Sequence, residues 1–404
     1  MIAVTKKRIV FLVDMNAFYI ACEMSRNNVL KDVPAAVAGD PQKRTGIILA
    51  ANYQARDFGI KTAMTLSEAL NKCPALVIVP PDHSYYSQRS KEVMNHLSHY
   101  TPAIEQNSID EAWIDMTGTE KLFGTPHQTA QRIMEELKKE LDLWCSIGIS
   151  DNKFLAKMAA DMQKPLGITE LWSWDVSTKL WPLPAQAMYG IGKKTMEKLK
   201  QLKISTIRDL AQCSPADLVH HLGSHGIDLH QKANGIDTSD VVAHLKEDMK
   251  SIGRSTTLAE DAYNVESVRD VFLALAEDVG MQARKYSKKG TTIQIILKFN
   301  DFNVITRQIT VAPTCYTKDL FDAGLHLLKK HWPSSRGVRL IGISLTGFNP
   351  QEDGKQMSIF DAMEDTSPGN QEDKVYKIDE VMDRIRKKHG SKTISRASLL
   401  RKNR

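Results

Sequence analysis

The 404-residue sequence contains no apolar run of about 18 or more residues, the length that a membrane-crossing helix needs. No basic segment leads into an apolar, cleavable stretch at its start, so no secretory leader is expected. Cysteine is scarce: the five cysteines lie far apart without a CxxC pair, which argues against a disulfide framework and a zinc site. We expect a cytoplasmic protein with reduced cysteines and, from its length, about two to four domains.

Neither sign of charge dominates the composition. The formal net charge is +6 and the sequence pI is about 8.8. This mildly basic balance fits a polyanionic partner without requiring one.

Two adjacent carboxylates, Asp110 and Glu111, stand between apolar residues that are typical of strands. A third acid, Asp14, ends the apolar run Ile9–Val13. Three acids at the ends of neighbouring strands would form a set of hard oxygen ligands for Mg²⁺ that carries phosphates. The alternative is that Asp110 and Glu111 form only a polar hairpin turn.

The pattern around these acids predicts strands and helices that interleave without strict βαβ repetition, which favours a split α+β sandwich. Asp151 is a candidate N-cap for the helix that follows it. The expected elements are a strand at 7–14, a helix at 15–30, a strand, turn and strand at 105–117, a strand at 145–150 and a helix at 153–162.

Four segments match one protein family in the expected order. They are Asp14-Met15-Asn16-Ala17-Phe18-Tyr19 with Glu23, Asn52-Tyr53-Gln54-Ala55-Arg56 with Phe58-Gly59-Ile60, Ser108-Ile109-Asp110-Glu111-Ala112, and Ser146 to Lys153 continuing to Lys164-Pro165-Leu166-Gly167. The chain resembles the Y-family DNA polymerases, the DinB/UmuC group of bacterial translesion enzymes. The resemblance covers nearly the whole sequence.

The resemblance implies an α+β multidomain fold, a right-hand polymerase with a ferredoxin-like palm, small fingers, a helix-hairpin-helix thumb and an α+β little finger. The implied domains are the palm at 1–30 and 83–170, the fingers at 31–82, the thumb at 171–240, a linker at 241–250, the DNA-binding little finger at 251–350 and a flexible tail at 351–404.

The resemblance also assigns the site residues. Asp14, Asp110 and Glu111 would be the catalytic acids and would hold two Mg²⁺ ions, with the backbone carbonyl of Met15 as a further ligand. Two metals would acidify a primer 3′-hydroxyl and neutralise the pyrophosphate that leaves.

The residues expected to bind the incoming nucleotide are Phe18, Tyr19, Tyr53, Arg56 and Lys164. A phenol, a guanidinium and an ammonium group can all bind phosphate oxygens. Tyr19 falls at the position of the family's steric gate, where a ring would collide with a ribose 2′-hydroxyl. The competing interpretation is that Tyr19 is an ordinary core aromatic.

One position departs from the usual family pattern, because Asn16 replaces the second acid of Asp-x-Asp. The three catalytic acids remain complete without it, so activity is expected. A metal-tuning or capping role for that acid is in doubt.

Two further segments point to macromolecular partners. Gly190, Gly192, Lys193 and Lys194 resemble the turn of a helix-hairpin-helix, whose backbone N–H groups bind DNA phosphate without reading sequence. The tail segment Gln356-Met357-Ser358-Ile359-Phe360 resembles the sliding-clamp peptide of bacterial polymerases, and its apolar end would fill a pocket. An amphipathic helix is expected at Tyr376–Lys388, with Ile378, Val381, Met382 and Ile385 on one face.

These features predict a monomeric, template-directed DNA polymerase of low fidelity, with primer-template DNA, deoxynucleoside triphosphates and the sliding clamp as partners and no membrane. One alternative is a nucleotide cyclase, which shares the two-metal chemistry but leaves the thumb and tail unexplained. The other is a catalytically silent scaffold that binds DNA and the clamp, which Asn16 makes conceivable.

Overall fold

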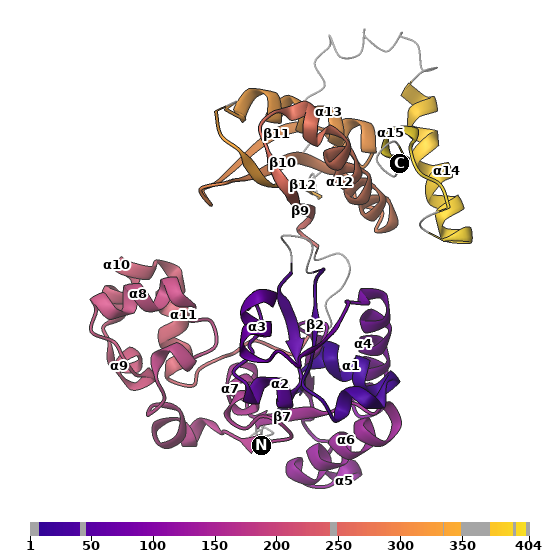
Figure 1. Ribbon diagram of the computed structural model, residues 1–404. Coiled ribbons are helices and arrows are strands. Elements are labelled where there is room, and N and C mark those ends of the chain that lie inside the picture. The colour runs from indigo at the N-terminus through magenta and orange to yellow at the C-terminus, as the bar shows by residue number, and fades with distance from the viewer. Residues whose placement is uncertain are drawn as a thin grey trace, which may run out of the picture. The chain divides into compact units, whose positions relative to one another are not determined.

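The computed structural model describes residues 8–40, 46–242, 249–333, 335–348, 372–390 and 393–400. The chain forms two compact units, Met1–His244 (unit 1) and Leu245–Arg404 (unit 2), both drawn in Figure 1. In the described part of the chain, no helix is long and apolar enough to cross a membrane.

Unit 1 is built around a five-stranded sheet with the strand order β5-β6-β1-β7-β8. Its strands are β1 (Val10–Met15), β5 (Ile104–Gln106), β6 (Glu111–Asp115), β7 (Cys145–Ser150) and β8 (Ile168–Glu170). The neighbouring helices are α1 (Phe18–Arg26), α4 (His83–Leu97), α5 (Glu120–Phe123), α6 (Pro126–Leu141) and α7 (Lys153–Met162). All pairs are antiparallel except β7 and β8, which run parallel.

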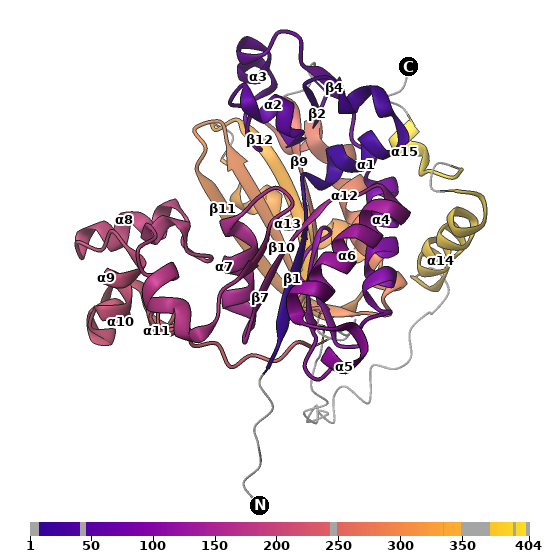
Figure 2. The ribbon, with the colours of Figure 1, turned by 90° about the horizontal axis from the view of Figure 1, so that it is seen from below.

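Strand β1 is buried on both faces, and its alternating side chains reach two different layers. Phe11 packs in the core that α1, α4 and α6 share, whereas Leu12 packs with Ala156 of α7. Because successive strand residues point to opposite faces, Asp14 lies on the same face as Leu12 and α7. Figure 2 shows β1 with α7 on one side and α4 and α6 on the other.

A smaller three-stranded sheet, ordered β3-β2-β4, lies between α1 and α4 in the sequence. Its elements are β2 (Ala35–Ala38), β3 (Ile48–Ala51), α2 (Tyr53–Asp57), α3 (Leu66–Lys72) and β4 (Val77–Val79). The buried Asn52 joins these elements. Its Oδ1 accepts from the N–H of Ala55 (2.9 Å) and of Ala35 (3.1 Å), and its Nδ2 donates to the carbonyl oxygen of Val33 (2.8 Å). The start of α2 is therefore fixed against the strands.

The last part of unit 1 is helical. Its core contains Leu199, Leu210, Leu218 and Leu229 and is shared with α7. The helices are α8 (Lys193–Gln201), α9 (Ile207–Gln212), α10 (Pro215–Leu222) and α11 (Ser224–Ala233). Helices α10 and α11 approach so closely that a Cβ at Gly226 would lie 2.5 Å from the carbonyl oxygen of Leu218.

Unit 2 contains an antiparallel sheet with the order β11-β10-β12-β9. Its elements are β9 (Ser251–Ala262), α12 (Val265–Lys285), β10 (Gly290–Phe299), β11 (Val304–Thr314), α13 (Thr317–His331), β12 (Val338–Thr346), α14 (Glu372–His389) and α15 (Ala397–Leu400). Ile293, Ile295 and Leu297 of β10 are fully buried with Phe272 of α12 and Leu320 of α13. This period of two places both long helices on one face of the sheet.

Helix α14 packs on unit 2 through charged side chains. Asp379 is only 3% exposed. Its carboxylate accepts from the N–H of Thr317 (2.8 Å) at the start of α13 and pairs with Arg284 (3.1 Å) and Arg396. Arg386 pairs with the buried Glu277 of α12 at 3.2 Å.

The structure differs from three of the expected elements. The N-cap of α7 is Asn152, not Asp151, because Oδ1 of Asn152 accepts from the N–H of Leu155 at 2.9 Å. The helix expected at 15–30 is the shorter α1, since Ala17 has the left-handed φ of 49° and Asn27 ends the helix. The apolar face expected on α14 is only partly buried: Met382 is buried, but Ile378 and Val381 are exposed.

Candidate active site

Antiparallel pairing of β1 and β6 brings the three acids to one end of the large sheet. Asp14 is the register partner of Glu111, and the N–H of Met15 donates to the carbonyl oxygen of Asp110 at 2.8 Å. The side chain of Asp110 is held by Ser108, whose Oγ donates to Oδ1 at 2.5 Å. Asn107 donates to Glu111 from the same turn.

Two lysine ammonium groups lie against these acids. Nζ of Lys157, on α7, donates to Oδ2 of Asp14 (3.0 Å) and to Oε2 of Glu111 (2.7 Å). Nζ of Lys164 donates to the same Oδ2 of Asp14 at 2.8 Å and pairs with Asp161 at 2.8 Å. Lys157 is buried, so its charge is compensated by the acids rather than by water.

The pKa directions agree with this pairing. Burial alone would raise the pKa of Asp14, but Lys164 and Lys157 outweigh it and hold the pKa below its ordinary value. Burial alone would lower the pKa of Lys157, but Asp14 and Glu111 raise it above the ordinary lysine value. Asp14 and Lys157 are therefore both charged at neutral pH.

The sequence predicts a cage of three acids, and the observed arrangement differs from it. Within the described residues, no three His, Cys, Asp or Glu side chains form a cluster ready to hold a metal ion. The ammonium group of Lys157 lies between Asp14 and Glu111 and compensates their negative charge. Two carboxylates that share one positive charge are a donor set that a divalent cation also fits.

A cavity of about 350 Å³ opens beside these groups. It is lined by Asp14, Met15, Asn16, Ala17, Phe18, Tyr19, Leu49, Ala50, Tyr53, Arg56, Thr62, Ile109, Asp110 and Lys164. The structure thus gathers two of the three predicted acids and all five predicted nucleotide-binding residues around one space. Glu111 does not line the cavity and is joined to it through Lys157.

Tyr53 and Arg56 come from the first turns of α2, which Asn52 fixes. The Arg56 guanidinium lies over the Tyr53 ring, 4.8 Å from its centroid, and Nε donates to the carbonyl oxygen of Ala51 at 3.0 Å. The Tyr53 hydroxyl is buried and has no hydrogen-bond partner in the described part of the chain. Burial raises the pKa of Tyr53, with Arg56 and Lys164 opposing the rise.

Tyr19 also lines this cavity and is held by a second tyrosine. Its ring stacks on the ring of the fully buried Tyr86, with the centroids 4.5 Å apart and the planes 18° apart. The Tyr86 hydroxyl donates to Oε1 of Glu23 at 2.6 Å, and Arg26 forms two hydrogen bonds to the same carboxylate. Tyr19 therefore has a defined ring orientation.

Comparisons with known proteins identify the family of this chain. A profile described as the impB/mucB/samB family matches residues 13–161, that of its C-terminal domain matches 249–359, and an IMS family HHH motif matches 175–204. The chain is 56% identical over 396 residues to a DNA polymerase IV of Alkaliphilus oremlandii, covering 97% of this chain and 99% of that protein. It is 39% identical to DNA polymerase IV 1 of Bacillus subtilis, covering 98% of this chain and 94% of that protein.

The chain belongs to the Y family of DNA polymerases. A solved Y-family DNA polymerase chimera resembles this polymerase with a TM-score of 0.74 and 26% identity, covering 84% of this chain and 99% of the chimera. The family and the multidomain α+β polymerase fold predicted from the sequence are confirmed.

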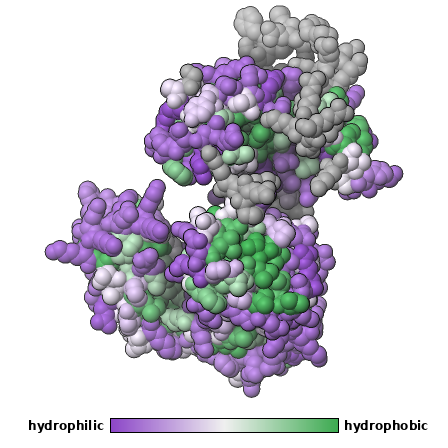
Figure 3. Space-filling model, viewed as in Figure 1, coloured by the Kyte–Doolittle hydropathy of each residue, from purple (hydrophilic) through white to green (hydrophobic). Residues whose placement is uncertain are grey.

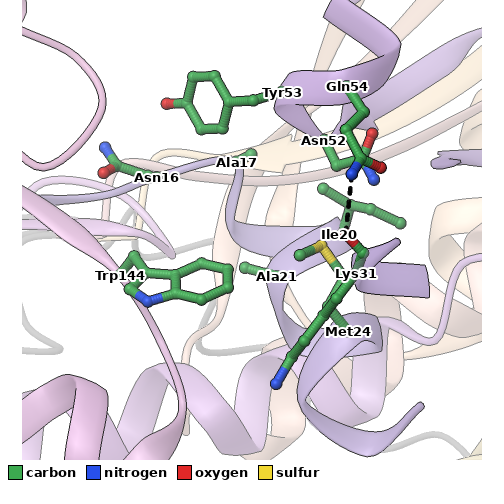
Figure 4. A pocket seen from close by; sticks show the side chains of 10 residues that line it. All are labelled: Asn16, Ala17, Ile20, Ala21, Met24, Lys31, Asn52, Tyr53, Gln54 and Trp144. Atoms are coloured by element: carbon green, nitrogen blue, oxygen red, sulfur yellow. Dashed lines mark hydrogen bonds between the residues drawn. The ribbon is translucent and has the colours of Figure 1, made fainter. Parts of the chain in front are cut away.

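The polymerase has a second cavity of about 220 Å³. Figure 4 shows its ten lining residues, among them Ile20 and Met24 of α1, Trp144 and Lys31. Asn16, Ala17 and Tyr53 line both cavities. The two cavities therefore adjoin each other at these three residues.

The residues expected to contact macromolecular partners lie away from these cavities. Gly192 is the N-cap of α8, Gly190 has the left-handed φ of 96°, and Lys193 and Lys194 are exposed. Figure 3 shows mainly polar surface around α8 and α10, and apolar side chains on unit 1 around β2. The expected clamp segment, residues 356–360, lies outside the described residues.

Three residues of the site received no role from the sequence. The sequence did carry a signal for Lys157, because it is the one charged residue in the otherwise apolar stretch 154–160. Asn52 precedes a short helix, where an amide is a typical N-cap. Tyr86 carried no signal, because its contact with Tyr19 depends on the packing of α4 against α1.

Proposed function

We propose that this polymerase performs template-directed, low-fidelity translesion synthesis by two-metal nucleotidyl transfer, in the response to DNA damage. One observation carries the proposal. A single cavity gathers two predicted catalytic acids, Asp14 and Asp110, with three predicted phosphate ligands, Tyr53, Arg56 and Lys164.

The acids Asp14, Asp110 and Glu111, with the Met15 carbonyl oxygen, would hold two Mg²⁺ ions. Their hard oxygens suit this ion, and the ammonium group between Asp14 and Glu111 indicates that the position favours positive charge. When bound, the metal pair supplies acidification of the primer 3′-hydroxyl and neutralisation of the departing pyrophosphate.

The triphosphate would be bound by Lys164, Arg56 and Tyr53. Lys164 brings a point charge and Arg56 a planar fork. The Tyr53 hydroxyl supports this assignment, because it is buried without a partner among the described residues and a phosphate oxygen would satisfy it. These groups orient the α-phosphate for attack by the primer hydroxyl.

The sugar of the nucleotide would lie against Tyr19. A ring that is stacked on the buried Tyr86 cannot easily move aside for a 2′-hydroxyl. Phe18 is buried beneath the same cavity and keeps the start of α1 in place. This arrangement would select deoxynucleotides.

Low fidelity follows from the small size of the proposed fingers, residues 31–82. Their helices α2 and α3 are five and seven residues long. Such short helices offer little surface to close over a nascent base pair, so geometric checking would be weak. A damaged template base would be tolerated for the same reason.

Primer-template DNA and deoxynucleoside triphosphates are the substrates that this family membership implies. We propose the palm at 1–30 and 83–170, the thumb at 171–240, the linker at 241–250 and the little finger at 251–350. Gly190, Gly192, Lys193 and Lys194 would bind DNA phosphates. The enzyme would act as a cytoplasmic monomer, and residues 356–360 of the tail, 351–404, would bind the sliding clamp.

Primer extension tests the proposal. A primer on an undamaged template, on an abasic site and on a bulky guanine adduct is incubated with all four deoxynucleotides and Mg²⁺. We expect extension past both lesions and none with the Asp110→Ala/Glu111→Ala variant. A cyclic nucleotide product would point to a cyclase, and DNA binding without extension would point to a silent scaffold; either outcome contradicts the proposal.

A further inference from the structure

Asn16 lies between the metal-binding strand and the turn that carries Lys164, and it is only 3% exposed. Its Nδ2 donates to Oγ of Ser146 on β7 at 3.0 Å, and its Oδ1 accepts from the N–H of Leu166 at 3.0 Å. The N–H of Asn16 donates to the carbonyl oxygen of Trp144 at 2.7 Å. Both ends of the amide and the main chain are therefore engaged.

The turn that receives this hydrogen bond is tight. Leu166 has a φ of 60°, in the left-handed region that a leucine adopts only when its surroundings hold it there. A Cβ at Gly167 would lie 2.1 Å from the carbonyl oxygen of Gln163, and the Gly167 carbonyl oxygen accepts from the N–H of Ile147 at 2.9 Å. The strained residue thus lies between two anchors on the large sheet.

Lys164 stands two residues before Leu166 and begins this turn. Its Nζ is 2.8 Å from Oδ2 of Asp14 and 2.8 Å from Oδ1 of Asp161. A four-carbon side chain on a mobile turn would spread its ammonium group over a wide volume. Fixing the backbone of Leu166 reduces that volume.

We propose that Asn16 is a positioning residue for Lys164. By accepting the hydrogen bond from the Leu166 N–H, Asn16 holds the turn in the position from which the Lys164 ammonium group would contact the triphosphate. The inference rests on the proposed role of Lys164 in binding phosphate. Asn16 itself acts through the backbone and does not need to touch the nucleotide.

The amide also explains why an uncharged residue suffices at this position. An aspartate could accept from the Leu166 N–H and from the Ser146 hydroxyl, so it would preserve both side-chain contacts. Asn16→Asp is therefore the conservative variant, whereas Asn16→Ala removes both contacts. Ser146→Ala is the matched control, because it removes one partner of the amide and leaves the bond to Leu166.

Steady-state incorporation of a correct deoxynucleotide measures the effect. We expect Asn16→Ala to raise the KM for the nucleotide about 3- to 10-fold, the size of one lost hydrogen bond, with kcat changed less. The Asn16→Ala/Lys164→Ala variant should have the KM of Lys164→Ala alone. Asn16→Asp and Ser146→Ala should stay within about twofold of the parent KM.

Two results would overturn the inference. The first is a KM of the double variant that is raised by the product of the two single-variant effects. The second is an Asn16→Asp enzyme with a KM as high as that of Asn16→Ala. If Lys164→Ala leaves KM unchanged, the phosphate role of Lys164 is wrong, and hydrogen exchange of the nucleotide-free protein decides about the turn. Exchange in residues 163–167 should be about 10-fold faster in Asn16→Ala and restored in Asn16→Asp. Equal exchange in all variants would refute positioning.

Discussion

Lys157 is the residue that joins two of the acids, Asp14 and Glu111. It is 8% exposed and its ammonium group bridges Asp14 and Glu111, which would otherwise repel each other across the β1–β6 register. A cation that enters the site must share or replace this contact. The lysine therefore holds Asp14 and Glu111 together, at the position where the proposed metal ions would bind.

Lys157→Met should lower the free energy of unfolding in EDTA by about 3 kcal/mol. This is the lower end of the range for removing one partner of a buried pair, because Lys164 still pairs with Asp14. Mg²⁺ should recover more stability in the variant than in the parent. Thermal unfolding with and without Mg²⁺ measures this gain. An equal gain in both proteins would contradict the idea that Lys157 occupies the position of the proposed cation.

Tyr19→Ala should admit ribonucleotides. Removing the ring opens space for a 2′-hydroxyl, so the preference for deoxynucleotides should fall by about 10-fold or more. Paired incorporation assays with a deoxynucleotide and its ribonucleotide give the ratio. Tyr85→Ala, which alters a neighbour of Tyr86 on α4, is the control. Unchanged sugar discrimination in Tyr19→Ala would reject the gate.

At the scale of single elements, helix α9 shows how a carboxylate can tie a helix start. Oδ2 of Asp209 accepts from the N–H groups of Ser205 (3.0 Å) and Thr206 (2.8 Å), while its own N–H donates to Oγ1 of Thr206 at 3.1 Å. The Ser205 and Thr206 N–H groups lower the pKa of Asp209 from 3.8 to about 2.

Asp209→Asn should therefore destabilise the protein in a pH-dependent way. The folded pKa lies below the unfolded one, so the stabilisation is complete above about pH 3.8 and is lost as the pH falls toward 2. Urea unfolding of parent and variant at pH 7 and pH 3 gives the comparison. The difference should shrink at pH 3; a constant difference would show that the charge of Asp209 contributes nothing.

A second prediction for a single element concerns Asp379 of helix α14. The carboxylate of Asp379 forms ion pairs with Arg284 and Arg396 and accepts a hydrogen bond from the N–H of Thr317. Asp379→Ala would remove one acid from Arg284 and one from Arg396, but Asp383 and Glu277 would still pair with them, so the cost should be about 3 kcal/mol, the lower end of the range for breaking a buried pair. Glu380→Ala, its exposed neighbour, should change the unfolding midpoint little. Equal midpoints for the two variants would mean that the Asp379 contacts contribute no stability.

Local sequence predicted some elements well and others poorly. Helix α7 has the predicted bounds, Lys153–Met162, because a capping amide and a Pro-Gly turn frame an apolar stretch. Strand β7 also has the predicted bounds, Cys145–Ser150, because the polar pair Asp151-Asn152 ends it. For α14 the sequence predicted an amphipathic helix but not its charged partners, because Arg284 and Glu277 lie about 100 residues away, where no local pattern reveals them.

The site was predictable to a similar degree. The family resemblance indicated Asp14, Asp110, Tyr53, Arg56 and Lys164, and these five residues line one cavity in the structure. It did not reveal that a lysine separates Asp14 from Glu111, since that depends on which face of β1 meets α7. Pairing across distant elements is the information that a linear pattern does not contain.

At the scale of the whole molecule, the two units have separate cores. Unit 2 buries 23 residues in one cluster, enough for an independent domain. We expect residues 249–404 produced alone to unfold cooperatively, as circular dichroism in urea would record. A gradual loss of signal without a midpoint would mean that unit 2 depends on unit 1.

The first described residue, Arg8, belongs to unit 1, and the last, Leu400, belongs to unit 2. A donor dye placed near the beginning of the chain would thus travel with the acids, and an acceptor near its end would travel with α12 and α13. Energy transfer between such dyes would report directly on rearrangement of the two units when DNA is engaged.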